Sequence, residues 1–143
     1  MLSASFIKFN KKWEHTETEL TLAPMGKFNM PSHTGDGVIS QKGEKSSFEM
    51  ITKDGVRHLK CEFHNFDGEK DFYCDITLKE PKQDTLVIAT PFDKKNHFYY
   101  NHKINCMPAS GWAEYDGHRY EFNADTDFGI LDWGRGVWTY DNW

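Results

Sequence analysis

The chain of 143 residues is long enough for one ordinary domain with a single core. It carries 17 Lys and Arg against 22 Asp and Glu, and the formal charge of -5 argues against a nucleic-acid partner or an anionic membrane surface. No stretch approaches the ~18 apolar residues of a membrane span, and the first residues lack the apolar centre of a secretory signal, so we expect a cytoplasmic protein. Aromatic residues make up 15% of the chain, which indicates a large core or a ligand cavity.

Residues 24–46 are predicted to form a long loop. This stretch is rich in Pro, Gly, Ser and Lys and contains only isolated apolar residues. Two alternatives stay open for it: a lid over one end of the fold, or a disordered connection. We expect the whole chain, residues 1–143, to form a single β domain around it.

Asp-Gly pairs mark the turns that follow. Such a pair between alternating segments favours a two-residue hairpin turn, because both positions need positive φ. Counting outward from Asp54-Gly55 and from Asp67-Gly68 gives two hairpins that share a strand and agree on which face is apolar, whereas a slip of one residue would invert every side chain. The pattern predicts an antiparallel meander whose apolar pairs are Met50 with Leu59, Phe48 with Cys61, Leu59 with Ile76, Cys61 with Cys74, and Phe63 with Phe72.

Cys61 and Cys74 face each other in this register, as a non-hydrogen-bonded pair if the turn at Asp67-Gly68 has two residues. They are either small apolar side chains of the core or a pair that could bridge on oxidation. Together with Cys106 they match no zinc or redox spacing, and no set of three ligands converges among the seven histidines. We therefore predict no metal site and no cofactor.

Two further strands are predicted in "DTLVIATPF" (residues 84–92) and "HFYYNHKIN" (97–105), and the facing of the second is left open. Asp116-Gly117 predicts a third hairpin that places Ala113 opposite Tyr120. The fold class is therefore all-β. Consecutive pairing of the strands favours an antiparallel up-and-down barrel or half-barrel over a sandwich.

The segment "LDWGRGVWTYDNW" (131–143) has the densest group of aromatic side chains. Asp132 and Arg135 are three residues apart across a predicted Trp-Gly turn, where they can form an ion pair with Trp133 against the guanidinium. Alternation then places Trp138 and Tyr140 on one face. Two interpretations stay open: a structural clasp at the barrel mouth, or a functional Asp132 that lines a ligand cavity as acid, base or anchor.

The stretches "HFYYNHKINCMPASGW" (97–112) and "YEFNADTDFGILDWGRGVWTY" (120–140) resemble the signature of the domain of unknown function 2804 (DUF2804) family. More distantly, their order is similar to the lipocalin-like superfamily of carotenoid hydratases and AttH-type proteins. The resemblance implies a calycin-type, lipocalin-like barrel in a protein more than twice as long, so the chain is expected to be the first half of a truncated two-barrel protein. Oligomers are then expected to form through the C-terminal edge near Trp138, Tyr140 and Trp143.

Four functional hypotheses follow. The first is a module that binds a hydrophobic small molecule in an aromatic-lined barrel. The second is a cofactor-independent hydratase or isomerase with Asp132 as proton donor and Arg135 orienting it; in the distant relatives Asp132 matches an Asp-containing turn. The third is a carbohydrate-binding β-sandwich, and the fourth is a fragment without function. The candidate ligand-binding residues are Trp133, Arg135, Trp138, Tyr140 and Tyr100.

Overall fold

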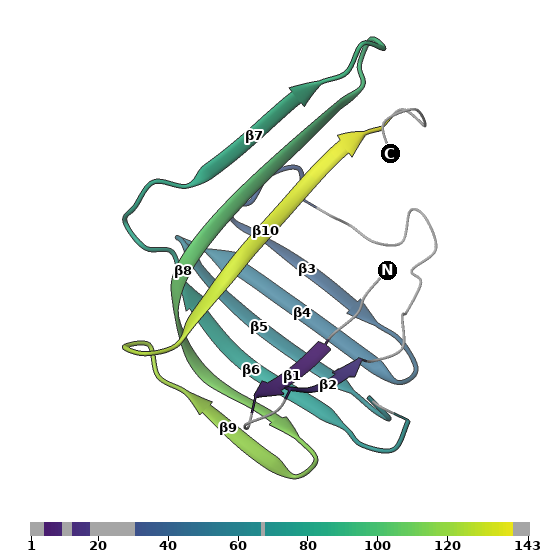
Figure 1. Ribbon diagram of the computed structural model, residues 1–143, viewed down its shortest axis with the longest axis vertical. Coiled ribbons are helices and arrows are strands. Elements are labelled where there is room, and N and C mark those ends of the chain that lie inside the picture. Colours follow the sequence, from purple (N-terminus) through teal and green to yellow (C-terminus); the bar gives the residue numbers. More distant parts are fainter. Residues whose placement is uncertain (1–4, 10–12, 18–30, 67, 139–143) are drawn as a thin grey trace.

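The computed structural model describes residues 5–9, 13–17, 31–66 and 68–138, and it contains no helix in these ranges. Every strand pairing in it is antiparallel, and the main sheet curls into a half-barrel (Figure 1). The all-β prediction and the lipocalin-like half-barrel are therefore confirmed.

Ten strands make up two sheets. The smaller sheet pairs β1 (Ser5–Phe9) with β2 (Trp13–Glu17). The larger sheet has the order β10-β8-β6-β5-β4-β3, and β7 and β9 also pair with β8. Its strands are β3 (Gly37–Lys42), β4 (Ser46–Lys53), β5 (Val56–Phe63), β6 (Phe72–Lys79), β7 (Leu86–Pro91), β8 (Phe98–Tyr115), β9 (His118–Phe122) and β10 (Phe128–Val137).

The predicted hairpin registers are confirmed. β4 pairs with β5, β5 with β6, and β8 with β9 in the predicted registers. The turn residues Asp54 and Gly55 both have positive φ, as do Asp116 and Gly117. Alternation of apolar residues with the correct turn chemistry was therefore sufficient to fix these pairs.

The prediction of an uninterrupted loop over residues 24–46 was wrong for residues 37–42. They form β3, which pairs with β4 from Gly37 opposite Thr52 to Lys42 opposite Ser47. Only Val38 and Ile39 are apolar in this strand, so the sequence shows no alternating apolar pattern from which the strand could be predicted. Its pairing with β4 identifies it.

The Cys61–Cys74 pair was predicted in the correct register but with the wrong hydrogen-bonding class. Glu80 donates its backbone N–H to the Gly55 carbonyl at 2.8 Å. Bonded and non-bonded pairs alternate along an antiparallel ladder, so Cys61 and Cys74, six residues further along, form a hydrogen-bonded pair. The count from a two-residue turn failed because the connection runs from residue 64 to residue 71.

One apolar cluster packs against the concave face of β5, β6 and β8. Phe66, in the connection before β6, stacks on Phe72 with ring centroids 5.0 Å apart. Each such buried ring contributes about 1.5–3 kcal/mol by leaving water. The buried members are Cys61, Phe63, Phe66, Phe72, Cys74 and Ala113.

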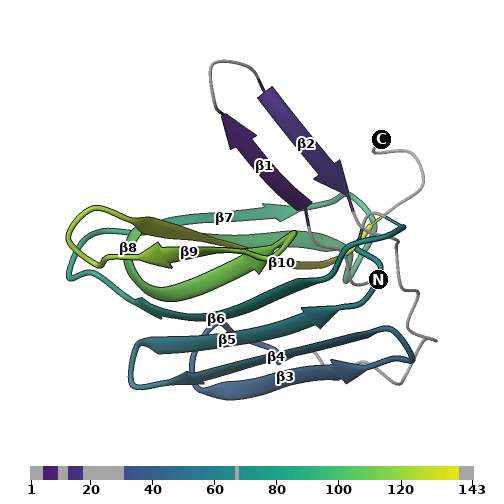
Figure 2. The same cartoon turned by 90° about the horizontal axis from the view of Figure 1, so that it is seen from below.

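The long strand β8 belongs to both parts of the curled sheet. Its second half pairs with β6 and β9, and its first half pairs with β7 and β10. Figure 2 shows the β7–β8–β10 part lying over the layer formed by β3 to β6. The bend lies at a β-bulge, where Cys106 has a φ of 54° and the register with β10 shifts between Gly129 and Leu131.

The bulge changes which residues face the interior. Before it Ile104 is buried, and after it Met107 is buried, three residues later and not at an even spacing. Tyr100 therefore faces the same interior as Ala113, although one has an even number and the other an odd number. Further along β8, Gly111 has a φ of 114°, and a Cβ there would overlap the Asp75 carbonyl oxygen of β6.

Candidate functional site

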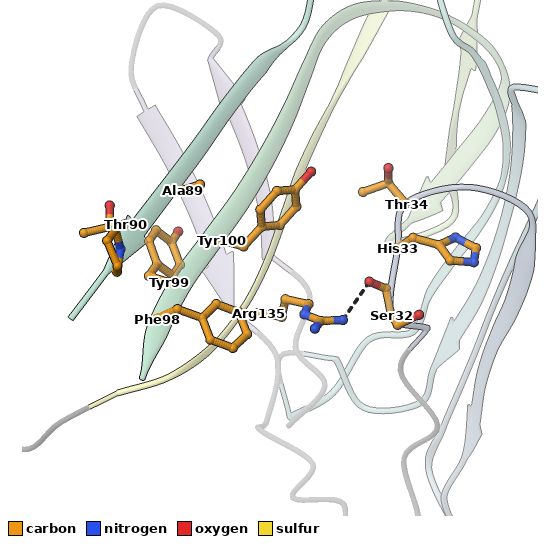
Figure 3. A pocket seen from close by; sticks show the side chains of 10 residues that line it. Ser32, His33, Thr34, Ala89, Thr90, Phe98, Tyr99, Tyr100 and Arg135 are labelled. Carbon is orange, nitrogen blue, oxygen red and sulfur yellow. Dashed lines mark hydrogen bonds between the residues drawn. The ribbon is translucent and has the colours of Figure 1, made fainter. Parts of the chain in front are cut away.

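A cavity with a volume of about 500 Å³ lies between the β7–β8–β10 part of the sheet and residues 32–34 (Figure 3). Figure 3 shows Phe98 and Tyr100 projecting from β8 and Arg135 from β10 toward the segment that carries Ser32 and Thr34. The lining residues are Ser32, His33, Thr34, Ala89, Thr90, Pro91, Phe98, Tyr99, Tyr100 and Arg135.

The position of Arg135 in the cavity follows from its place in β10, which runs without a break from Phe128 to Val137. It lies opposite Tyr100 in the β8–β10 ladder, and directly opposed residues share a face. Its Nη1 donates to the Ser32 carbonyl oxygen at 3.0 Å, and its guanidinium carbon lies 5.6 Å from the centre of the Phe98 ring. In the described part of the chain, no carboxylate pairs with this guanidinium.

Asp132 lies on the opposite face, so the predicted Asp132–Arg135 ion pair was wrong. There is no turn at Trp133 and Gly134, because β10 runs through them. In an extended strand, residues three apart point to opposite faces. The irregularity in this ladder lies earlier in β10, at the register shift between Gly129 and Leu131.

The Asp132 carboxylate has partners of its own. It accepts a hydrogen bond from Asn101 Nδ2 at 2.7 Å and forms an ion pair with Lys103. The hydrogen bond from Asn101 and then that from Lys103 hold the pKa of Asp132 below its ordinary value of 3.8. Asp132 does not line the cavity, and an exposed, ionised carboxylate is the opposite of the neutral proton donor that the hydratase hypothesis requires.

The other candidate residues divide between two faces. Tyr100 lines the cavity and meets the buried Trp133 ring edge-on, with centroids 5.9 Å apart. Trp133 lines a second, much smaller cavity beside it. Trp138 is 49% exposed and packs against Tyr99, at a centroid distance of 5.9 Å. The candidate Tyr140 lies outside the described residues.

Trp133 also carries an unsatisfied polar atom. Its Nε1 is buried and has no hydrogen-bond partner in the ranges that the structure describes. The indole N–H is a donor only. A buried donor without a partner has an energetic cost, so Trp133 Nε1 is a polar atom that the described residues leave unsatisfied.

Three polar side chains fix residues 32–34 as a wall of the cavity. Arg57 donates to the Thr34 carbonyl at 2.8 Å, and Thr34 Oγ1 shares a hydrogen bond of 2.8 Å with His102 Nδ1. Arg135 holds Ser32, as described above. Of the two alternatives for the predicted loop, these contacts favour the lid for residues 32–34.

Arg57 was missed by the sequence reasoning, although the signal was present. The predicted register places it on the same face as Leu59 and Cys61, which is the buried face. It is 1% exposed, and its Nη2 lies 2.5 Å from a carboxylate oxygen of Glu80. Arg57 is thus a long charged side chain at an inward position, where it forms an ion pair with Glu80 and supports the cavity wall at Thr34.

Within the described ranges, no group of three or more His, Cys, Asp or Glu side chains is placed to hold a metal ion. The same residues include no helix with the length and apolar character needed to cross a membrane.

These features define a lipocalin-like β half-barrel with an aromatic-lined cavity between β7, β8, β10 and residues 32–34. Neither a curated protein nor a solved structure matches the chain. The model of the family described as "Domain of unknown function (DUF2804)" matches residues 1–143, and the chain belongs to that family.

Proposed function

We propose that this protein binds an apolar small molecule in the cavity between β7, β8, β10 and residues 32–34. A volume of about 500 Å³ falls in the range of about 300–1,000 Å³ that is typical of small-molecule sites. Aromatic and aliphatic side chains line the cavity together with polar side chains that can fix the orientation of a ligand, a combination found in such sites. The observation that carries the proposal is that Phe98, Tyr100, Ala89 and Pro91 line one continuous cavity.

The proposal is tested with N-phenyl-1-naphthylamine, an uncharged apolar fluorophore. We expect its emission to rise on binding, with a dissociation constant in the micromolar range. Ala89→Trp, which fills the cavity from β7, is expected to weaken binding at least tenfold. Ile88→Trp is the matched control, because Ile88 is the neighbouring residue on the other face of the same strand and does not line the cavity.

Two results would overturn the proposal. One is no fluorophore binding by the unmodified protein. The other is equal binding by Ala89→Trp and Ile88→Trp, since the site would then lie elsewhere. Circular dichroism of each variant verifies the fold, and oligosaccharides in the same assay test the carbohydrate alternative.

A further inference from the structure

We infer that the ligand carries a carboxylate group and that Arg135 binds it. This inference rests on the proposed function, and it adds the chemical class of the molecule. Its basis is the unequal pairing of the chain's three arginines, Arg57, Arg119 and Arg135.

Two of the arginines have a carboxylate partner within the chain. Arg57 pairs with Glu80, and Arg119 Nε lies 2.5 Å from a carboxylate oxygen of Glu121. Arg135 lines the proposed ligand cavity, and among the described residues its hydrogen-bond partner is a neutral carbonyl, that of Ser32. A guanidinium has five N–H donors in a planar fork that matches a carboxylate.

The surroundings of Arg135 fit a carboxylate at the end of an apolar chain. The guanidinium lies over the face of Phe98, and Tyr100 is opposite it on β8. A hydrogen bond from the guanidinium to a carboxylate is charge-assisted and stronger than one to a neutral group. Because Arg135 is exposed, we place the carboxylate at the cavity entrance and the apolar chain along Tyr100 and Ala89.

The charge of the cavity favours a carboxylate over a phosphate monoester. Among the residues that the structure describes, no lysine lines the cavity. His33 does line it, but its Nδ1 accepts a hydrogen bond of 3.1 Å from the Gly35 backbone N–H, which requires that nitrogen to carry no proton. One guanidinium therefore provides a single positive charge, which matches a monoanion. A phosphate monoester carries a charge of about -1.5 to -2 at neutral pH.

The test compares three ligands that share one tail: octanoic acid, octan-1-ol and octyl phosphate. Isothermal titration calorimetry at pH 7.5 measures each against the unmodified protein. We expect octanoate to bind at least tenfold more tightly than octanol, because a hydrogen bond to a charged group is stronger than one to a neutral group by an amount that corresponds to about a tenfold change in affinity. We expect octyl phosphate to bind no more tightly than octanoate.

Arg135→Met is expected to remove the preference for octanoate and to leave octanol binding within about threefold. Arg119→Met is the matched control, because Arg119 also lies over an aromatic ring, that of Trp112 at 4.1 Å, but outside the cavity. The control is expected to keep the full preference for the acid.

Each outcome decides one question. Equal binding of acid and alcohol by the unmodified protein overturns the inference and leaves the proposed function standing. Tighter binding of octyl phosphate, or a preference for the acid that persists in a folded Arg135→Met variant, also overturns the inference. Failure of all three ligands and of N-phenyl-1-naphthylamine overturns the proposed function itself.

Discussion

Glu80→Gln is expected to destabilise the protein more than removal of its buried partner Arg57. The Arg57 residue is 1% exposed, and its ion pair is with Glu80, whose side chain is 35% exposed. Without Glu80, the guanidinium stays in the interior with one carbonyl, that of Thr34, and the sulfur of Met107 at 3.9 Å. Leaving a buried charge unpaired costs about 3–5 kcal/mol. Because Glu80 is partly exposed, we expect the lower end of that range.

Arg57→Met is expected to cost about 1–2 kcal/mol. The Glu80 carboxylate can then be hydrated, and the main loss is the hydrogen bond to the Thr34 carbonyl. The double variant Arg57→Met/Glu80→Gln is expected to be more stable than Glu80→Gln alone, because it no longer buries an unpaired charge.

Urea unfolding at pH 7, followed by far-ultraviolet circular dichroism, measures all three free energies of unfolding. Glu121→Gln is the matched control, because it removes the partner of an arginine that is 49% exposed, and it is expected to change stability by less than about 0.5 kcal/mol. The reasoning is refuted if Glu80→Gln costs less than Arg57→Met, or no more than the exposed control.

Four further predictions concern other parts of the molecule. Hydrogen bonds from the Asn65 backbone N–H and from neighbouring side chains lower the pKa of Asp71 from 3.8 to about 2. Its contribution to stability is therefore present above pH 3.8 and lost as the pH falls toward 2, and Asp71→Asn should flatten that part of a stability curve measured between pH 6 and pH 2. Gly111→Ala should lower the free energy of unfolding by at least about 2 kcal/mol in urea titrations, because an L residue is strained at a φ of 114° and its Cβ would meet β6. Ellman's reagent should modify the exposed Cys106 in the native protein and the two other thiols only after unfolding, because Cys61 and Cys74 are both buried. Light scattering at high concentration should detect an oligomer that Trp138→Ser weakens, because Trp138 is 49% exposed; a monodisperse monomer would contradict this prediction.

The sequence was sufficient for the hairpins because each carries two independent signals. Turn residues such as Asp54-Gly55 fix where the chain reverses, and the period-two apolar pattern fixes which face is buried. The connection between Phe63 and Phe72 is longer than a two-residue turn. It changed which β5–β6 pairs are hydrogen-bonded, but it did not change which residues are opposed, so the register was still predicted correctly.

The site was predicted only in part, because it depends on a bend that no residue pattern marks. Tyr100 and Arg135 were both among the candidate ligand-binding residues, and both line the cavity. Asp132 was expected on the same side because a turn was inferred from Trp-Gly, but glycine in a strand also permits close approach of a neighbouring chain. The bulge at Cys106 could not be inferred, since nothing about that residue type favours positive φ.

The bulge in β8 also determines where this chain can accept changes in length. Strand residues alternate in a fixed phase, and the extra residue at the bulge shifts that phase between the half of β8 that lines the cavity and the half that packs the core. A deletion of one residue there would restore strict alternation and keep Tyr100 and Ala113 on the same face, because their odd spacing would become even. A single-residue deletion in a regular part of β8, for example at Ala109 or Ser110, removes no such extra residue and should turn either Tyr100 or Ala113 toward the outside. Changes in length should therefore be accepted in connections such as residues 123–127 and at the bulge, whereas a deletion within the regular pairing of β8 should abolish either the cavity or the core.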